Sequence, residues 1–131
     1  MKKELCRMAR NNLREVGDLN DCLFCKIARK EIPADIVYED DDVLAFRDIR
    51  PQAPVHVLVI PKRHIATLAD LTQEDKDVMG HVTLVASRLA RDLGVSEGYR
   101  VVINCGKDAG QSVFHIHMHL LGGRSLGWPP G

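Results

Sequence analysis

Residues 114–120 read Phe114-His115-Ile116-His117-Met118-His119-Leu120, so apolar and histidine side chains alternate without a break. Successive side chains of a β-strand point to opposite faces, and this alternation therefore predicts a strand over Val113 to Leu121. One face of the strand packs into a core, and the other presents three imidazoles. The alternative to a functional row is an amphipathic edge strand that is rich in histidine by chance. The chain contains six histidines in all.

The spacing of the three imidazoles limits the chemistry they can perform. At about 3.3 Å per residue, the Cα atoms of His115 and His119 lie about 13 Å apart, too far for three rings to share one metal ion. We therefore expect no catalytic metal on this row. Neighbouring imidazoles also make a second proton costly, so His117 stays neutral near pH 7 and keeps a nucleophilic nitrogen.

The segment before the histidine row suits an anion. Gly106 and Gly110 allow backbone N–H groups to approach a ligand closely, and the Ser112 hydroxyl can donate a proton. A neutral imidazole beside such donors indicates attack on phosphorus.

Composition excludes several classes of protein. With 131 residues, of which 45% are apolar, the chain forms one folded domain. Eighteen basic and eighteen acidic residues leave no net charge, so neither nucleic acid nor a membrane is expected as a partner. The longest strongly apolar stretch, Val55 to Pro61, is far shorter than the roughly 20 residues of a membrane span. Four cysteines without a signal peptide indicate a reducing compartment, and we expect a cytoplasmic protein.

Periodicity predicts the other elements of an α+β fold. We expect residues 1–20 to be a polar lead-in, either disordered or loosely helical, and residues 21–131 to form the domain. We expect a short helix over Cys22 to Lys30, capped by Asp21 and stopped at Ile32-Pro33, and a long helix that starts at a Thr72/Asp75 capping box and ends at Gly94. The expected strands are a hairpin of Ile36 to Glu39 with Val43 to Arg47, a central strand over Val55 to Pro61, and a strand over Tyr99 to Asn104.

Several separated motifs resemble one family. The run from His115 to Leu121 matches the His-x-His-x-His-x-x signature of the histidine-triad (HIT) nucleotide-binding proteins. Pro51-Gln-Ala-Pro-Val-His56, Gly110-Gln-Ser-Val, Leu121-Gly-Gly-Arg124 and the ending Trp128-Pro-Pro-Gly131 are similar to the Hint branch, the purine nucleoside phosphoramidases. The resemblance covers about residues 22–131. It implies a HIT-like fold, with an antiparallel sheet of about five strands, one short and one long helix, and a homodimer.

The resemblance assigns a role to each matching residue. His117 is the expected nucleophile at the α-phosphorus of a nucleoside phosphoramidate, and Ser112 is the proton donor to the leaving amine. Catalysis would involve His117, Ser112 and His119. Purine nucleotides such as AMP or GMP, and their phosphoramidates, would be bound by Leu23, Phe24, Ile27, Phe46, Asp48, Ile49, His56, Asn104, Gln111, Ser112, His117 and His119, with Asp48 on the ribose and the apolar side chains on the base.

Cys22 and Cys25 form a Cys-x-x-Cys half-site with three possible explanations, namely zinc ligation, a redox pair, or two ordinary buried thiols. The redox explanation lacks the preceding strand of a βαβ unit. In zinc-containing HIT proteins the two further ligands correspond to His64 and His115. The resemblance therefore implies one structural zinc ion per chain, held by Cys22, Cys25, His64 and His115.

Two other functions stay open. The chain could hydrolyse dinucleoside polyphosphates instead of phosphoramidates. It could also be a zinc-stabilised nucleotide-binding or interaction module with little catalysis, although a pure binding module has no use for a nucleophile.

Overall fold

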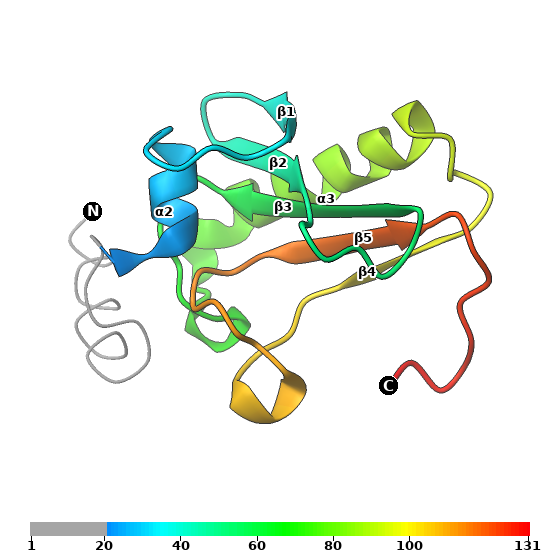
Figure 1. The fold of residues 1–131 in the computed structure, drawn as a ribbon. Helices are drawn as coiled ribbons and strands as arrows, with labels where there is room; N and C mark the ends of the chain where they lie inside the picture. The colour runs from blue at the N-terminus through cyan, green and yellow to red at the C-terminus, as the bar shows by residue number, and fades with distance from the viewer. Residues whose placement is uncertain (1–20) are drawn as a thin grey trace.

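The computed structural model describes residues 21–131, so the expected lead-in over residues 1–20 lies outside the described part of the chain. The described residues form a five-stranded antiparallel sheet with one short and one long α-helix (Figure 1). The strands are β1 (Ile36–Glu39), β2 (Val43–Arg47), β3 (Val55–Pro61), β4 (Tyr99–Val102) and β5 (Met118–Gly122), and their order in the sheet is β1-β2-β3-β5-β4. The predicted α+β class is confirmed, with β3 in the centre.

The short helix α2 (Leu23–Ala28) differs from its prediction at both ends. Cys22, not Asp21, is the N-cap, because its Sγ accepts a hydrogen bond from the Cys25 N–H. The helix ends at Ala28, earlier than Lys30, since the chain turns at Lys30 with a φ of 65°. The cap therefore belongs to the half-site itself.

The long helix α3 (Lys76–Asp92) is entered through the predicted capping box. Thr72 and Asp75 form the box around a 3₁₀ turn (Gln73–Asp75), and α3 follows directly. The Asp75 carboxylate is buried and also pairs with Arg63. The helix stops before Gly94, whose φ of 80° suits glycine.

Each face of the sheet covers a separate core. α3 packs on one face against side chains such as Val57, Val59 and Leu120, and it runs behind the sheet in Figure 1. α2 packs on the other face, where Phe24 and Ile27 meet side chains that alternate with the first set on the same strands, including Phe46 and Leu58. The site described below lies on the α2 face.

Two strands are shorter than predicted. β5 begins at Met118 instead of Val113, because the residues before Met118 do not pair with β3. Met118, opposite Val59, is the first residue of β5 in the ladder. Pro61 has no N–H to donate, and its carbonyl is taken by the His115 ring at 2.8 Å. β4 ends at Val102, opposite His119, and does not reach Asn104.

None of the helices within residues 21–131 has the length and apolar character needed to cross a membrane.

Candidate active site

The histidine row divides between two places. His119 lies in β5, and its ring centroid is 5.0 Å from that of His117 and 5.2 Å from that of His56 in β3. His115 instead approaches His64, with 5.0 Å between ring centroids. The Phe24 ring of α2 is steeply inclined to the rings of His115 and His117, with ring centroids 6.0 and 5.1 Å apart. One row of imidazoles thus serves two sites.

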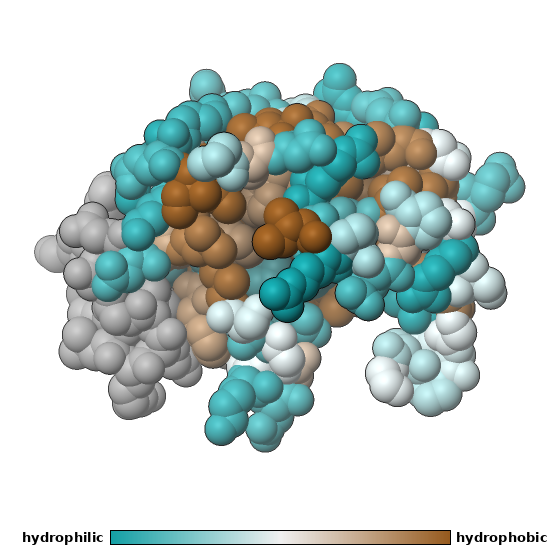
Figure 2. Space-filling model, viewed as in Figure 1, coloured by the Kyte–Doolittle hydropathy of each residue, from teal (hydrophilic) through white to brown (hydrophobic). Residues whose placement is uncertain are grey.

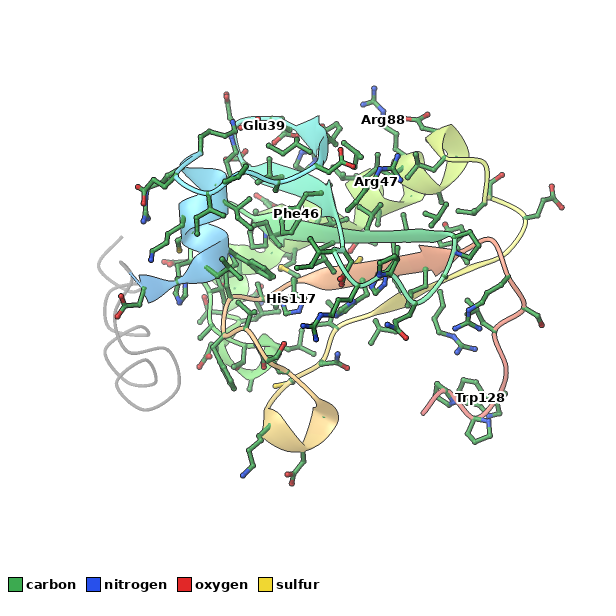
Figure 3. All side chains as sticks on the ribbon, viewed as in Figure 1. Glu39, Phe46, Arg47, Arg88, His117 and Trp128 are labelled. Carbon is green, nitrogen blue, oxygen red and sulfur yellow. The ribbon has the colours of Figure 1, made fainter. Side chains whose placement is uncertain are left out.

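His117 and His119 line a cavity of about 570 Å³ between α2 and the sheet. This volume falls in the range of roughly 300–1,000 Å³ that is usual for small-molecule sites. Figure 2 shows apolar side chains gathered on this face and bordered by polar groups, and Figure 3 shows Phe46 above His117. The lining comprises Leu23, Phe24, Ile27, Ile32, Pro33, Ala34, Asp35, Phe46, Arg47, Asp48, Ile49, Leu58, Ser112, Val113, His117 and His119. Apolar walls therefore lead to a polar end that holds a hydroxyl and two imidazoles.

Nine of the twelve predicted nucleotide-binding residues line this cavity: Leu23, Phe24, Ile27, Phe46, Asp48, Ile49, Ser112, His117 and His119. The other three are not among the lining residues. His56 is directly behind His119, and Asn104 is half-buried after β4. The buried side chain of Gln111 bonds the Gly106 N–H and the carbonyls of Ala66 and Val113, so it holds the loop in place.

Sequence reasoning missed seven lining residues. Ile32 and Pro33 served only as the helix stop, and Ala34, Asp35 and Arg47 belonged to no motif. Val113 ended the Gly110-Gln-Ser-Val motif but was not assigned to the cavity. Leu58 carried a usable signal, because it lies two residues after His56 on the same strand face. Asp35 and Arg47 form an ion pair at 3.4 Å on the wall of the cavity.

The hydrogen bonding of His117 leaves one nitrogen free for chemistry. Its Nδ1 lies 2.8 Å from the carbonyl oxygen of His115, which can only accept, so Nδ1 carries the proton. The lone pair of the neutral ring is then on Nε2. Burial lowers the pKa of His117 below its ordinary value, which keeps this ring uncharged near pH 7. The arrangement is that of a nitrogen nucleophile.

His56 and His119 form a directed pair. The Gln52 N–H donates to Nδ1 of His56 at 3.0 Å, so neutral His56 carries its proton on Nε2. That Nε2 lies 2.9 Å from Nδ1 of His119 and 3.4 Å from the Asp48 carboxylate. His119 accepts at Nδ1 and therefore keeps an Nε2–H as a donor on the other side of its ring.

Burial also keeps this pair neutral. Burial is the main cause that lowers the pKa of His119 to about 4. The second cause is repulsion from the positive charge that His117 and His56 carry when they are protonated. Burial lowers the pKa of His56 as well, and the Asp48 carboxylate opposes that shift. Asp48, His56 and His119 lie close enough to be metal ligands. The amide donor on His56, however, keeps a proton on the nitrogen that would have to bind the ion, so this group is a hydrogen-bonded chain.

Cys22, Cys25, His64 and His115 form a second, fully buried cluster that could hold a metal ion. Nδ1 of His64 is 3.3 Å from Sγ of Cys25, and Nδ1 of His115 is 3.4 Å from Sγ of Cys22 and 3.5 Å from Sγ of Cys25. Sulfur and nitrogen ligands of a tetrahedral zinc ion, at bond lengths of about 2.3 and 2.05 Å, would lie about 3.5 Å apart. The four predicted ligands are thus brought together in a suitable arrangement.

The surroundings of the cluster prepare its donor atoms. His115 donates from Nε2 to the Pro61 carbonyl, which leaves Nδ1 unprotonated toward the cysteines. The hydrogen bond between the two cysteine side chains lowers the pKa of Cys22 and, together with burial, raises that of Cys25. Nε2 of His64 is buried without a hydrogen-bond partner among residues 21–131.

Comparison with known proteins agrees with the site. A family model described as the HIT domain matches residues 29–126. The chain belongs to the HIT family. It is 60% identical over 111 residues to an uncharacterised HIT-like protein of Synechococcus elongatus, which covers 85% of this chain and 97% of that relative.

Solved HIT structures share the fold. A HIT family hydrolase from Legionella pneumophila has a TM-score of 0.83 and 57% identity, covering 84% of this chain and 99% of that one. A HIT family hydrolase from Clostridium thermocellum has a TM-score of 0.81 and 49% identity, covering 84% and 96% of the two chains. A histidine triad nucleotide-binding protein from Candida albicans has a TM-score of 0.71 and 36% identity, covering 82% of each chain. This chain therefore has the fold of HIT family hydrolases.

Proposed function

We propose that this chain hydrolyses purine nucleoside phosphoramidates at the P–N bond through a nucleotidyl-histidine intermediate on His117. One observation carries the proposal. A neutral imidazole presents an unprotonated Nε2 at the polar end of a cavity with apolar walls. A binding module needs no such nitrogen, whereas covalent catalysis does. The related protein of Candida albicans is described as nucleotide-binding, which supports a nucleotide as the ligand.

The first chemical step transfers the nucleotidyl group to the enzyme. The Nε2 lone pair of His117 attacks the α-phosphorus, the P–N bond to the amine breaks, and Ser112 gives the amine its proton. The Nε2–H of His119 donates to a phosphate oxygen as negative charge develops there. In the second step water attacks phosphorus, the bond to His117 breaks, and a proton from the water returns to Ser112. The products are a nucleoside monophosphate and the free amine.

Two walls of the cavity accommodate the rest of the nucleotide. Phe24, Ile27, Phe46 and Leu58 form an apolar slot for the purine, and Leu23 and Ile49 lie at its exposed border. Asp48 is half-buried beside the polar end and can accept hydrogen bonds from the ribose hydroxyls. The family resemblance also assigns Asn104 and backbone N–H groups to the phosphate oxygens.

The test of this function is the variant His117→Ala. We expect its turnover of an adenosine phosphoramidate to fall by at least about 1,000-fold while AMP still binds, because the ring supplies the covalent step and little of the contact area. His81→Ala, on α3 and away from the cavity, is the matched control. Labelled nucleotide should be trapped on wild-type protein and not on His117→Ala. A wild-type rate in His117→Ala would remove His117 from the mechanism, and faster cleavage of a diadenosine polyphosphate would assign that substrate class.

We also propose that the buried cluster holds one structural zinc ion per chain. Two thiolates and two imidazoles are the donors that zinc prefers, and all four residues are buried, as in closed structural sites. The ion would join α2 to His64 and to the segment before β5. Because its cysteine ligands must stay reduced, we assign the protein to the cytoplasm.

A homodimer is the proposed assembly. β4 lies at the edge of the sheet and pairs only with β5 within residues 21–131, and it exposes Tyr99 and Val101. An apolar edge strand is a ready template for another strand. A second copy of this chain pairing along β4 would cover it.

A further inference from the structure

The segment that follows β5 is packed against the loop that precedes β3. Gly123 has a φ of 95°, and a Cβ on it would lie 2.9 Å from Cβ of Pro54, so only glycine allows this close approach. Next to it, the Arg124 guanidinium donates from Nε to the Gln52 carbonyl at 2.9 Å and from Nη1 to the Ser125 carbonyl at 2.9 Å. Arg124 therefore clamps the loop through Gln52.

Gln52 is also the residue that orients His56. Its backbone N–H donates to Nδ1 of His56 at 3.0 Å, and its side chain donates to the Arg50 carbonyl at 3.0 Å. The loop is fixed further by the Arg50 N–H, which donates to Asp48 at 2.8 Å. The Gln52 residue is thus held at its carbonyl by Arg124 while its N–H meets the imidazole.

The Gln52 N–H sets the direction of the hydrogen bond between His56 and His119. A backbone amide can only donate, so Nδ1 of His56 must accept and Nε2 must carry the proton. Nε2 of His56 then donates to Nδ1 of His119, and His119 keeps its Nε2–H. If the Gln52 amide turned away, His56 could carry its proton on Nδ1. His119 would then donate to His56 and present a bare lone pair at Nε2, which repels a phosphate oxygen.

We propose that Arg124 is a positioning residue that fixes the tautomers of His56 and His119 by clamping Gln52. Arg124 does not line the cavity, and it acts through the two peptide groups that flank the Gln52 Cα and through two imidazoles. The importance of the His119 tautomer for turnover rests on the proposed function, but the tautomer itself is a property of the free protein.

The experiment compares Arg124→Ala with two matched controls. Arg100→Ala removes a guanidinium that bonds the Gly127 carbonyl in the same C-terminal segment and is not bonded to the loop. Gln52→Ala removes the side chain and keeps the backbone N–H. Ring ¹⁵N chemical shifts of histidine-labelled protein, measured without substrate, report which nitrogen of each imidazole is protonated.

In wild type, Arg100→Ala and Gln52→Ala we expect His56 and His119 to be in the Nε2–H tautomer. In Arg124→Ala we expect the ¹⁵N shifts of both rings to move toward a mixture of tautomers. We also expect kcat to fall about 10-fold with KM changed less than about twofold, as misplacement of a distant support can do. Arg124→Lys should recover part of both effects, because an ammonium group can still bond the Gln52 carbonyl.

Unchanged ¹⁵N shifts in Arg124→Ala would overturn the proposal, and so would equal changes in Arg124→Ala and Arg100→Ala, since those would reflect the C-terminal segment as a whole. Because the shifts are recorded on the free protein, a chain without phosphoramidase activity would still test the role of Arg124.

Discussion

His115 and His117 are two residues apart and have opposite free nitrogens. His115 donates from Nε2 to the Pro61 carbonyl and presents Nδ1 to the cysteines. His117 donates from Nδ1 to the His115 carbonyl and presents Nε2 to the cavity. Each free nitrogen is therefore selected by a backbone carbonyl, and a carbonyl can only accept.

The lowered pKa values of the active-site imidazoles predict that stability falls in mild acid. The folded pKa of His119 is about 4, whereas the unfolded chain has the ordinary value of 6.5. Between pH 4 and pH 6.5 the unfolded state binds more protons at His119 than the folded state does. The contribution of His119 to the free energy of unfolding is therefore complete above pH 6.5 and is lost as the pH falls from 6.5 to 4. The slope is at most about 1.4 kcal/mol per pH unit for this ring. Urea denaturation from pH 7 to 4.5 measures it, and an equal slope in the near-isosteric His119→Asn would contradict the assignment.

Asp48 gives a second prediction at this scale. Asp48→Ala should weaken AMP binding about 10-fold and dAMP binding much less, because the proposed acceptor of the ribose hydroxyls is lost. Calorimetric titration of both nucleotides measures the difference. Asp41→Ala, at the exposed β1–β2 turn, is the control and should bind as wild type does. If wild-type protein binds AMP and dAMP equally, Asp48 does not read the ribose.

At the scale of elements, α2 cannot be stable by its own backbone hydrogen bonds. It has six residues, and isolated helices below about 12–15 residues are marginal in water. Phe24 and Ile27 bury its inner face, and Cys22 and Cys25 bring its first turn to His64 and His115. The position of α2, and with it one wall of the cavity, therefore depends on the buried cluster.

This dependence predicts the effect of metal removal. Elemental analysis should find close to one zinc ion per chain, and strong chelation should lower Tm by roughly 10 °C or more, since the free energy of ligation is also free energy of folding. Cys25→Ser should reproduce the loss, because a hydroxyl is a much poorer zinc ligand than a thiolate. Cys105→Ser, outside the cluster, is the control.

In the same samples we expect a smaller loss of turnover than of thermal stability, because His117, the proposed nucleophile, is not one of the four cluster residues. Protein purified gently and found to contain no zinc would refute the structural site. Loss of turnover on chelation with an unchanged Tm would point to a metal in the reaction itself.

At the scale of the whole molecule, the sheet separates a core that contains no site residue from the face that carries both sites. One face packs against the 17 residues of α3, and the other carries α2, the cavity and the cluster. Strand side chains alternate between these faces, so neighbouring residues such as Val57 and Leu58 belong to different cores. The exposed edge of the same sheet, β4, is where a second copy is proposed to pair.

The dimer is tested by a charge on that edge. Val101→Lys should shift the mass measured by light scattering from dimer to monomer, because a lysine on an edge strand disfavours pairing. Leu68→Lys, at another exposed apolar side chain, should stay dimeric. A wild-type monomer at micromolar concentration would refute the assembly, and a dimer in Val101→Lys would place the interface elsewhere.

The sequence by itself determined the element types, the central position of β3, and which residues are candidates for the two sites. These are local properties: a period of two marks a strand, a capping box marks a helix start, and a Cys-x-x-Cys pair marks a half-site. The four residues of the buried cluster and nine of the cavity residues could be named on that basis together with the family resemblance.

Only the tertiary structure decided how the histidine row divides and which nitrogen of each ring is free. Alternation places three imidazoles on one face, but it does not contain the Pro61 carbonyl that bonds His115 or the His56 ring that bonds His119, which lie 54 and 63 residues away in the chain. It also predicted a strand from Val113, whereas the backbone joins the ladder only at Met118. The physical reason is that the hydrogen bonds of His115 and His119 depend on the position and polarity of distant partners, and folding brings those partners into place.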